Sequence, residues 1–435
     1  MTRTLEAAPP GLARLPADHP IARVCGLTLA GVLAFGLILP WVLQAGYFLL
    51  ALIGLAWLTA RRQWSWSSLP GDEKRLILAV LAFIFVWVVG WLGHGAADEG
   101  TRALGRMARL LPVIPIVLLL RRIDGLTRYW WLGLTLGALL AGVYALGFTL
   151  TGQTSAYGAR VDGPTNPIYF GGLALAFGLM LIPRLMDGDA GLAWRWLVLL
   201  AITLAFVANA LSGARGAWPA VPIVLLMFAW TLGAGQPFRL RFGLPVLLIG
   251  LIVGVAATAM VTINARHAET IAEIVMLAHG QETIGAIGQR LAMWDLAGSL
   301  IASNPLWGVG PGVFAESLQQ AVDSGRLDVE FERYRHPHSQ YLSALLISGL
   351  PGLISLLALF GSALVLFART GHIAGWPRSP LAWAGLVAIG VIGIMALTES
   401  IFERNAGVVW FGLLTAVLAA LARPASGAAE NGQQD

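Results

Sequence analysis

Long apolar runs alternate with short polar segments along nearly the whole chain. A helix needs about 20 mainly apolar residues to cross the hydrocarbon core of a bilayer, and the chain contains twelve runs of this kind. They predict membrane-spanning helices at residues 22–39, 41–60, 75–93, 104–120, 129–150, 167–183, 195–211, 217–233, 242–262, 340–368, 380–397 and 406–422. The pattern therefore predicts an all-α integral membrane protein with about twelve transmembrane helices.

A long polar segment, residues 263–337, separates the ninth and tenth predicted spans. Within it, apolar side chains that include Leu291 recur at helical spacing over residues 283–303, which indicates an amphipathic helix. A second helix is predicted from Val313 to about Ser324. We therefore expect this segment to form one large helical loop outside the membrane.

The amino-acid composition narrows the class of protein. Of the 435 residues, 57% are hydrophobic and 12% are charged, whereas soluble proteins carry about 25% charged residues. This balance excludes a soluble enzyme and a disordered chain. The single cysteine, Cys25, excludes an internal disulfide and a metal site built from cysteines.

The basic residues orient the predicted bundle, because cytoplasmic loops of membrane proteins carry an excess of Lys and Arg. With the N-terminus in the cytoplasm, 17 basic residues fall on the cytoplasmic side and four in the short outer loops. No nucleic-acid partner is expected, because the basic residues lie in short runs between apolar segments and form no soluble patch. The predicted division is a cytoplasmic tail (1–21), transmembrane helices 1–9 (22–262), an outer loop domain (263–337), transmembrane helices 10–12 (338–422) and a second cytoplasmic tail (423–435).

Three arginines on the predicted outer side are candidates for binding phosphate. Arg160 lies between the fifth and sixth spans, Arg215 lies in the short turn between the seventh and eighth, and Arg290 lies on the amphipathic helix. An arginine offers five donors in a fixed fork that suits phosphate or carboxylate. The alternative is that Arg160 pairs with Asp162 and that Arg290 pairs with Asp295 or stays solvated.

The segment from Arg333 to Leu342 concentrates polar side chains at the outer start of the tenth span. Pro337 suits a helix start, so His338 is expected in the first turn of that helix. An imidazole with an ordinary pKa near ~6.5 can exchange a proton at neutral pH, which makes His338 the candidate catalytic residue. The possible supporting residues are His336, Arg335, Tyr334, Gln340 and Glu399.

A metal site is the rival use of the two histidines. His336 and His338 lack a carboxylate nearby in the sequence, although Glu330, Glu332 or Glu399 can fold close to them. The one Asp-x-Asp sequence, Asp187-Gly188-Asp189, falls in a predicted cytoplasmic loop. We therefore predict arginines, with no metal and no cofactor, as the groups that neutralise a diphosphate.

Two acids and a basic residue near the eleventh span leave a further choice open. Glu399, Glu403 and Arg404 lie at the predicted outer end between the eleventh and twelfth spans. They either complete the site or pair with one another.

The chain resembles the O-antigen ligase family, which also includes O-antigen polymerases and protein O-oligosaccharyltransferases. The resemblance rests on the twelve spans, on the large outer loop and on His338-Ser339-Gln340-Tyr341-Leu342 followed by Gly349 and Gly352. The Arg160 and Arg215 segments are also similar to arginine-bearing outer loops of this family. Many members carry an acid just before the first glycine, where this chain has Ile347-Ser348, so no acid is assigned there.

The resemblance implies a metal-independent glycosyltransferase with a GT-C-like arrangement of helices in the bacterial inner membrane. Its active site and the loop at 263–337 would be periplasmic. The implied donor is an undecaprenyl-diphosphate-linked O-antigen and the implied acceptor is lipid A–core, as in lipopolysaccharide biosynthesis. The arginines would hold the diphosphate, and His338 would take a proton from the acceptor hydroxyl or orient it.

Other functions remain open at this point. An O-antigen polymerase or a protein O-oligosaccharyltransferase of the same family would use similar residues with another acceptor. A multispan transporter or a flippase for the lipid-linked glycan would share the topology. A transporter is expected to show internal repeats and ionisable groups at the bilayer midplane, and this sequence shows neither.

Overall fold

The computed structural model describes residues 14–64, 66–67, 69–95, 98–186, 191–231, 275–276, 285–374 and 379–422. Throughout these ranges the regular structure is helical, and β-pairing is limited to two isolated bridges, Leu15 with Ile123 and Ser155 with Gly158. The prediction of an all-helical fold is therefore confirmed for the described residues.

Seven helical segments are long and apolar enough to cross a membrane. They are α2 (Val42–Ala60), α3 (Gly71–Gly93), the joined α4 (Asp98–Met107), η1 (Ala108–Leu110) and α5 (Val113–Leu120), α6 (Leu126–Leu150), α7 (Pro167–Leu181) with η2 (Ile182–Met186), α8 (Leu192–Ser212), and α14 (Gln340–Ala374). Shorter apolar helices are α1 (Pro20–Phe35), η3 (Arg215–Ala217) with α9 (Ala220–Thr231), α15 (Pro380–Met395) and α16 (Asn405–Leu421). The chain is a multi-pass membrane protein. The predicted ninth span, residues 242–262, lies outside the described residues, so the count of twelve stays a prediction.

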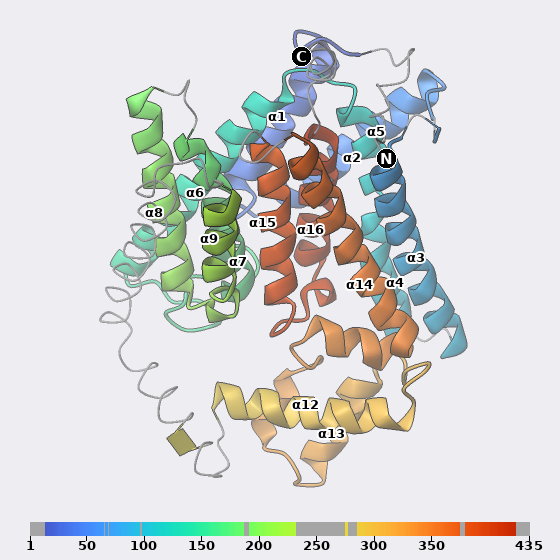
Figure 1. The fold of residues 1–435 in the computed structure, drawn as a ribbon. Coiled ribbons are helices and arrows are strands. Elements are labelled where there is room, and N and C mark those ends of the chain that lie inside the picture. Colours follow the sequence, from blue (N-terminus) through green and yellow to red (C-terminus); the bar gives the residue numbers. More distant parts are fainter. Residues whose placement is uncertain are drawn as a thin grey trace.

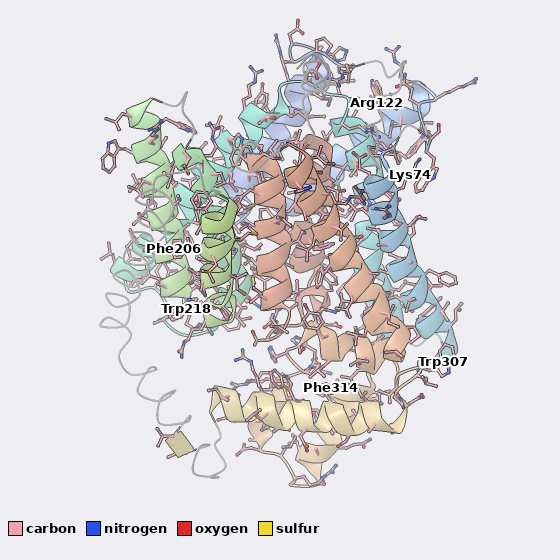
Figure 2. All side chains as sticks on the ribbon, in the orientation of Figure 1. Lys74, Arg122, Phe206, Trp218, Trp307 and Phe314 are labelled. Atoms are coloured by element: carbon pink, nitrogen blue, oxygen red, sulfur yellow. The ribbon has the colours of Figure 1, made fainter. Side chains whose placement is uncertain are left out.

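Helices α7, α15 and α16 form the centre of the bundle. Almost every side chain of α7 and α16 is buried, as expected of helices that are apolar on all sides. Figure 1 shows α6, α8 and α9 on one side of this centre and α3 and α4 on the other. Side chains fill the spaces between these helices (Figure 2).

Helices α12 (Ala286–Ser303) and α13 (Val313–Asp323) lie together beyond the end of the bundle where α14 begins (Figure 1). Both helices were predicted within the long polar segment. The buried face of α12 differs from the prediction, because Gln289, Met293 and Ala297 are buried while Leu291 is 45% exposed. The two helices share a small apolar core with Phe331 and with Leu346 of α14.

Helix α14 is broken near its start, although an uninterrupted span was predicted there. Gly349 has φ +59° and ψ −150°, a conformation open in practice only to glycine. A Cβ at Gly349 would lie 2.4 Å from the carbonyl carbon of Leu306. At the same break, the Val309 amide donates to the Leu346 carbonyl over 2.7 Å. The first glycine of the family motif therefore lets the segment between α12 and α13 pack directly on the bundle.

Candidate active site

His338 lies just before α14, not within its first turn. Ser339 caps the helix: its hydroxyl accepts a hydrogen bond from the Leu342 amide (3.4 Å), and α14 begins at Gln340. The prediction that Pro337 marks the helix start was wrong, because serine is the better N-cap. His338 instead adopts φ +52°, a left-handed conformation rare for a residue with a side chain.

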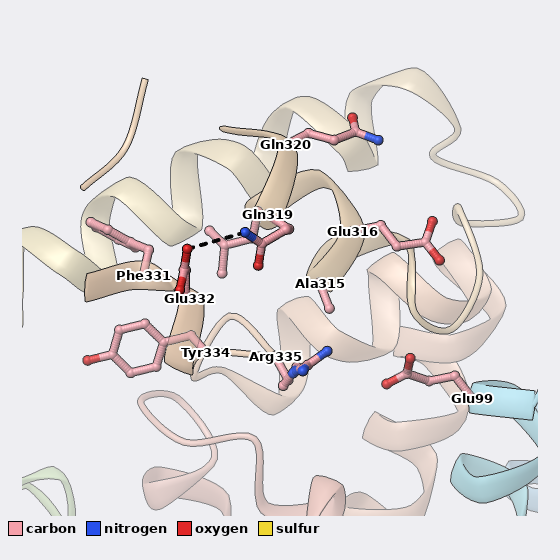
Figure 3. A pocket seen from close by; sticks show the side chains of 10 residues that line it. Glu99, Ala315, Glu316, Gln319, Gln320, Phe331, Glu332, Tyr334 and Arg335 are labelled. Carbon is pink, nitrogen blue, oxygen red and sulfur yellow. Dashed lines mark hydrogen bonds between the residues drawn. The ribbon is translucent and has the colours of Figure 1, made fainter. Parts of the chain in front are cut away.

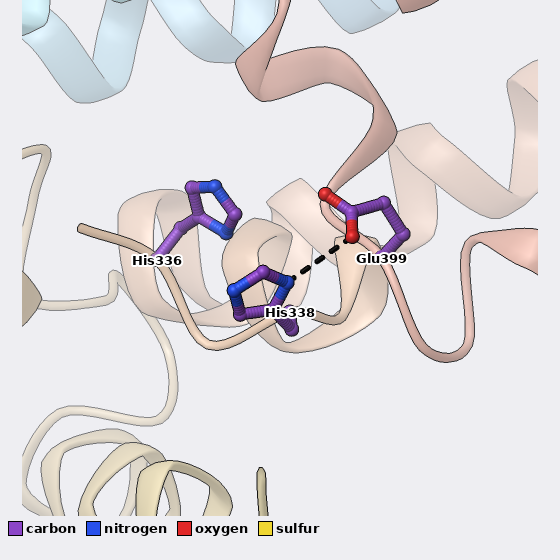
Figure 4. A group of neighbouring side chains, drawn as sticks. All are labelled: His336, His338 and Glu399. Atoms are coloured by element: carbon purple, nitrogen blue, oxygen red, sulfur yellow. Dashed lines mark hydrogen bonds and ion pairs between the residues drawn. The ribbon is translucent and has the colours of Figure 1, made fainter. Parts of the chain in front are cut away.

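Several contacts hold His338 in this conformation, which costs on the order of 1–3 kcal/mol and persists only where the surroundings enforce it. His338 Nδ1 lies 3.1 Å from Glu399 Oε2 (Figure 4). The ring of Tyr334 packs edge-on against the imidazole at 5.2 Å between centroids, and that of His336 lies at 4.6 Å. Contacts with three side chains therefore fix the orientation of the His338 ring.

Glu399 is the direct partner of His338 and is only 1% exposed. Burial alone would raise the pKa of its carboxyl, but the hydrogen bond from His338 and the charges of His338, His336 and Arg290 lower the pKa overall. An ionised carboxylate can only accept a hydrogen bond. The proton of the neutral imidazole is therefore assigned to Nδ1, which leaves Nε2 of His338 as a base.

Gln340 fastens the Glu399 segment to the start of α14. Its side chain is fully buried, its Oε1 accepts from the Phe402 backbone amide (2.7 Å), and its backbone amide donates to the Ala396 carbonyl (2.8 Å). The hydroxyls of Ser343 and Ser400 meet at 2.9 Å beside it. The predicted supporting residue Gln340 thus holds the two segments that carry His338 and Glu399 in register.

His336 and Tyr334 complete the surroundings of His338. Burial lowers the pKa of His336 to about 4, and the neighbouring His338 adds to that effect, so His336 is neutral at neutral pH. The Tyr334 hydroxyl donates to Gln289 on α12 over 2.7 Å. Both predicted supporting residues therefore lie against the catalytic candidate.

Arg335 takes a different position from the other supporting residues. It is exposed and lines a cavity of about 290 Å³ with Glu99, Glu316 and Glu332 (Figure 3). Arg335 therefore lies among the carboxylates of Glu99, Glu316 and Glu332, and no contact joins it to His338 in the described residues.

Arg160 bonds to the turn after α8, the same turn that carries Arg215. Arg160 donates from Nε to the Ser212 carbonyl (2.8 Å) and from Nη2 to the Gly213 carbonyl (3.3 Å). Arg215 begins η3, and a Cβ at Gly216 would lie 2.4 Å from Thr398 Oγ1. The turn that carries Arg215 is therefore packed against the residue before Glu399.

Arg290 reaches the same region from α12. Its charge lowers the pKa of Glu399, which requires the two side chains to lie within electrostatic range. One turn later, the Trp294 indole donates to the Pro337 carbonyl over 2.8 Å and joins α12 to the His338 loop. Arg290 thus acts on Glu399 itself, whereas Arg160 and Arg215 belong to the turn after α8, which packs against Thr398.

The structure also supplies the acid that a metal site would need. His336, His338 and Glu399 each offer a ligand atom, and these atoms lie within 4.8 Å of one another. Two imidazoles and a carboxylate are a donor set that suits zinc. Glu330 instead accepts from Gln289 (2.9 Å). The predicted absence of a metal stays a prediction, and Asp187 to Asp189 lie outside the described residues.

Glu399 and Glu403 have different partners. Glu399 lies against His338, whereas Glu403 forms an ion pair of 2.5 Å with Arg106 of α4. This partner of Glu403 was not predicted from the sequence, although Arg106 lies among regularly spaced arginines of a helix predicted to start on the outer side. The role of Glu399 in the site stays a prediction.

Comparison with known proteins agrees with the predicted resemblance. A family model described as O-antigen ligase matches residues 197–357, a stretch that contains both Arg215 and His338. An uncharacterized protein of Haemophilus influenzae is 24% identical over 386 residues, which cover 86% of this chain and 92% of that protein. Over residues 197–357 the chain is thus similar to the O-antigen ligase family.

Proposed function

We propose that the protein is an O-antigen ligase that transfers glycan from undecaprenyl diphosphate to a sugar hydroxyl of lipid A–core. The reaction would take place at the periplasmic face of the bacterial inner membrane. The family supports ligase- or polymerase-type activity on lipid-linked glycans in a membrane. The observation that carries the proposal is the 3.1 Å contact between His338 Nδ1 and the buried carboxylate of Glu399.

In the proposed reaction, Nε2 of His338 takes the proton of the acceptor hydroxyl. The acceptor oxygen then attacks the anomeric carbon of the donor sugar and forms the new glycosidic bond. The bond from that carbon to the diphosphate oxygen breaks, and its electron pair leaves with undecaprenyl diphosphate. Glu399 stabilises the positive charge that develops on the imidazole, as a carboxylate does behind a catalytic histidine.

The arginines act on the leaving group in this proposal. A diphosphate gains negative charge as the glycosidic bond breaks, and donors already in place for that charge lower the barrier. Arg160 stiffens the turn that carries Arg215 through its bonds to Ser212 and Gly213, and Arg290 approaches from α12. Fixed guanidinium groups also hold the donor in line with His338.

Acceptor identity separates the related functions. A polymerase would extend a second lipid-linked glycan, and a protein O-oligosaccharyltransferase would modify a peptide hydroxyl. A transporter or flippase would need no imidazole activated by a buried acid. The His338–Glu399 pair therefore favours a glycosyl-transfer reaction over transport of the glycan across the membrane.

Transfer by the purified protein tests the proposal. Lipid-linked O-antigen is offered with lipid A–core, with a second lipid-linked glycan or with an acceptor peptide, each in excess EDTA. We expect lipid A–core alone to gain sugar, and we expect EDTA to leave the rate unchanged. Extension of the second glycan would make the protein a polymerase. Loss of transfer in EDTA that Mg²⁺, Mn²⁺ or Zn²⁺ restores would mean that His336, His338 and Glu399 hold a metal.

Cysteine labelling tests the proposed orientation. Lys74 and Arg122, both predicted to be cytoplasmic, lie toward the end of the bundle opposite Phe314 of α13 (Figure 2). After Cys25 is replaced by serine, a cysteine at the exposed Gln319 should react with an impermeant maleimide once the outer membrane is permeabilised. A cysteine at the exposed Ser67 should stay protected until the inner membrane is opened. The reverse pattern would invert the proposed topology.

A further inference from the structure

A second basic site lies beside the proposed active site. A cavity of about 660 Å³ is lined by Arg102, Arg106, Arg109 and Arg404, with Glu403 as its one carboxylate. Neither Arg160 nor Arg215 lines it. The cavity therefore carries an excess of positive charge that the arginines assigned to the donor do not account for.

The spacing of three of these residues explains why they share the cavity. Arg102, Arg106 and Arg109 lie four and three positions apart in α4 and η1, so they project from one face of the helix. Arg404 follows η6 (Ile401–Glu403) and approaches from the start of α16. Like charges on one helix face repel each other, so their clustering calls for an anion.

The contacts within the cavity leave most of this charge unpaired. Glu403 pairs with Arg106 at 2.5 Å, and Arg109 donates to the Gly105 carbonyl at 2.5 Å. Among the described residues, no carboxylate lies within ion-pair distance of Arg102 or Arg404. These two exposed guanidinium groups are free to bind a ligand that carries phosphate.

The cavity and the His338–Glu399 pair lie on the same short segment. Glu399 contacts His338, and Glu403 and Arg404 line the cavity only four and five residues later. Arg106 pairs with Glu403 at 2.5 Å, so α4 is joined to the segment that carries Glu399. A headgroup in the cavity would therefore lie beside the catalytic candidate.

We propose that this cavity binds the phosphate of a phosphorylated glycolipid acceptor. The inference rests on the proposed function: transfer between two lipid-anchored substrates requires two headgroups at His338 at the same time. Arg160, Arg215 and Arg290 take the diphosphate of the donor, and the cavity takes the phosphate on the acceptor sugar. Its volume lies within the range of about 300–1,000 Å³ of ligand sites.

The test compares the double variant Arg102→Gln/Arg404→Gln with the wild type. Glutamine removes the charge and keeps a polar side chain. With phosphorylated lipid A–core as acceptor, we expect the acceptor KM to rise at least 10-fold, while kcat and the donor KM stay within about 2-fold. With dephosphorylated lipid A–core, the double variant and the wild type should have the same acceptor KM. The matched control is Arg326→Gln, because Arg326 is an exposed arginine near α13 that lies outside the cavity. This variant should leave the acceptor KM, the donor KM and kcat unchanged.

A thermal-shift measurement in neutral detergent tests binding without catalysis. Phosphorylated lipid A–core should raise the Tm of the wild type, and neither its dephosphorylated form nor phosphatidylglycerol should do so. The double variant should show no such shift. An equal shift with phosphatidylglycerol would make the cavity a site for bulk anionic lipid, and a raised donor KM in the double variant would assign it to the donor. Either result would overturn the inference. A wild type that binds lipid A–core in this way but transfers no sugar would refute the proposed function alone.

Discussion

Replacing His338 with alanine is expected to lower turnover by about 10²–10⁴-fold, the usual contribution of a positioned general base. Donor binding should survive, because the diphosphate is assigned to the arginines and the imidazole to the acceptor hydroxyl. Turnover is measured with saturating donor and acceptor, and donor binding is measured separately by the Tm shift that undecaprenyl diphosphate produces. A loss of turnover with an unchanged donor shift is the expected pair of results.

His336→Ala is the matched control for that variant. His336 lies against His338, but burial keeps its imidazole neutral, and its Nδ1 has no hydrogen-bond partner among the described residues. Its loss should cost much less than the loss of His338. An inactive His336→Ala protein together with near-normal activity of His338→Ala would show that the motif was aligned on the wrong histidine.

The spans could be predicted from the sequence because bilayer thickness fixes the length of an apolar helix. The runs that became α2, α6 and α8 are visible without knowledge of any contact between them. The break in α14 was not predicted. It depends on the approach of Leu306 to Gly349, and the two residues are 43 positions apart in the sequence.

The candidate site was predicted only in part, for a similar reason. His338, Arg160 and Arg215 stood out because charged and polar groups are costly near a membrane. Glu399 was named only as a possible supporting residue, since its approach to His338 follows from the packing of α14 against α15. The left-handed conformation of His338 has no signal in the residue types around it.

The basic cavity had a signal that the sequence analysis did not use. Arg102, Arg106 and Arg109 recur at helical spacing on a segment predicted to lie on the outer side, where positive charge has no topological explanation. The fourth arginine, Arg404, joins them only through the contact between α4 and η6. The arginine spacing on one helix could therefore be recognised in the sequence, whereas the cavity that these arginines line together with Arg404 could not.

Replacing Glu399 with glutamine is expected to lower turnover by about 10²–10⁴-fold, close to the effect of His338→Ala. The amide has nearly the shape of the carboxyl, but it carries no charge and can donate to Nδ1 as well as accept from it. The imidazole then loses both its enforced tautomer and the stabilisation of its protonated form. Glu399→Asp should retain part of the activity, because the charge is kept while the reach to His338 is shortened.

Glu399→Gln should also change how the stability of the folded protein depends on pH. Folding lowers the pKa of Glu399 below its ordinary value of 4.5, so at acid pH the folded protein binds fewer protons than the unfolded chain. The resulting stability is present above pH 4.5 and is lost as the pH falls through the folded pKa. We expect the Tm of the wild type in detergent to fall more steeply below pH 4.5 than that of Glu399→Gln. Equal slopes would show that the carboxyl is not held ionised by His338 and Arg290.

A double variant decides whether Glu399 acts through His338 or only supports the fold. If the carboxylate works by orienting the imidazole and stabilising its protonated form, it has no function left once His338 is replaced by alanine. His338→Ala/Glu399→Gln should then turn over no more slowly than His338→Ala, although each single variant is severely impaired. Multiplicative losses in the double variant would mean that Glu399 contributes independently of His338. The proton acceptor of the reaction would then have to be sought among other groups near the diphosphate.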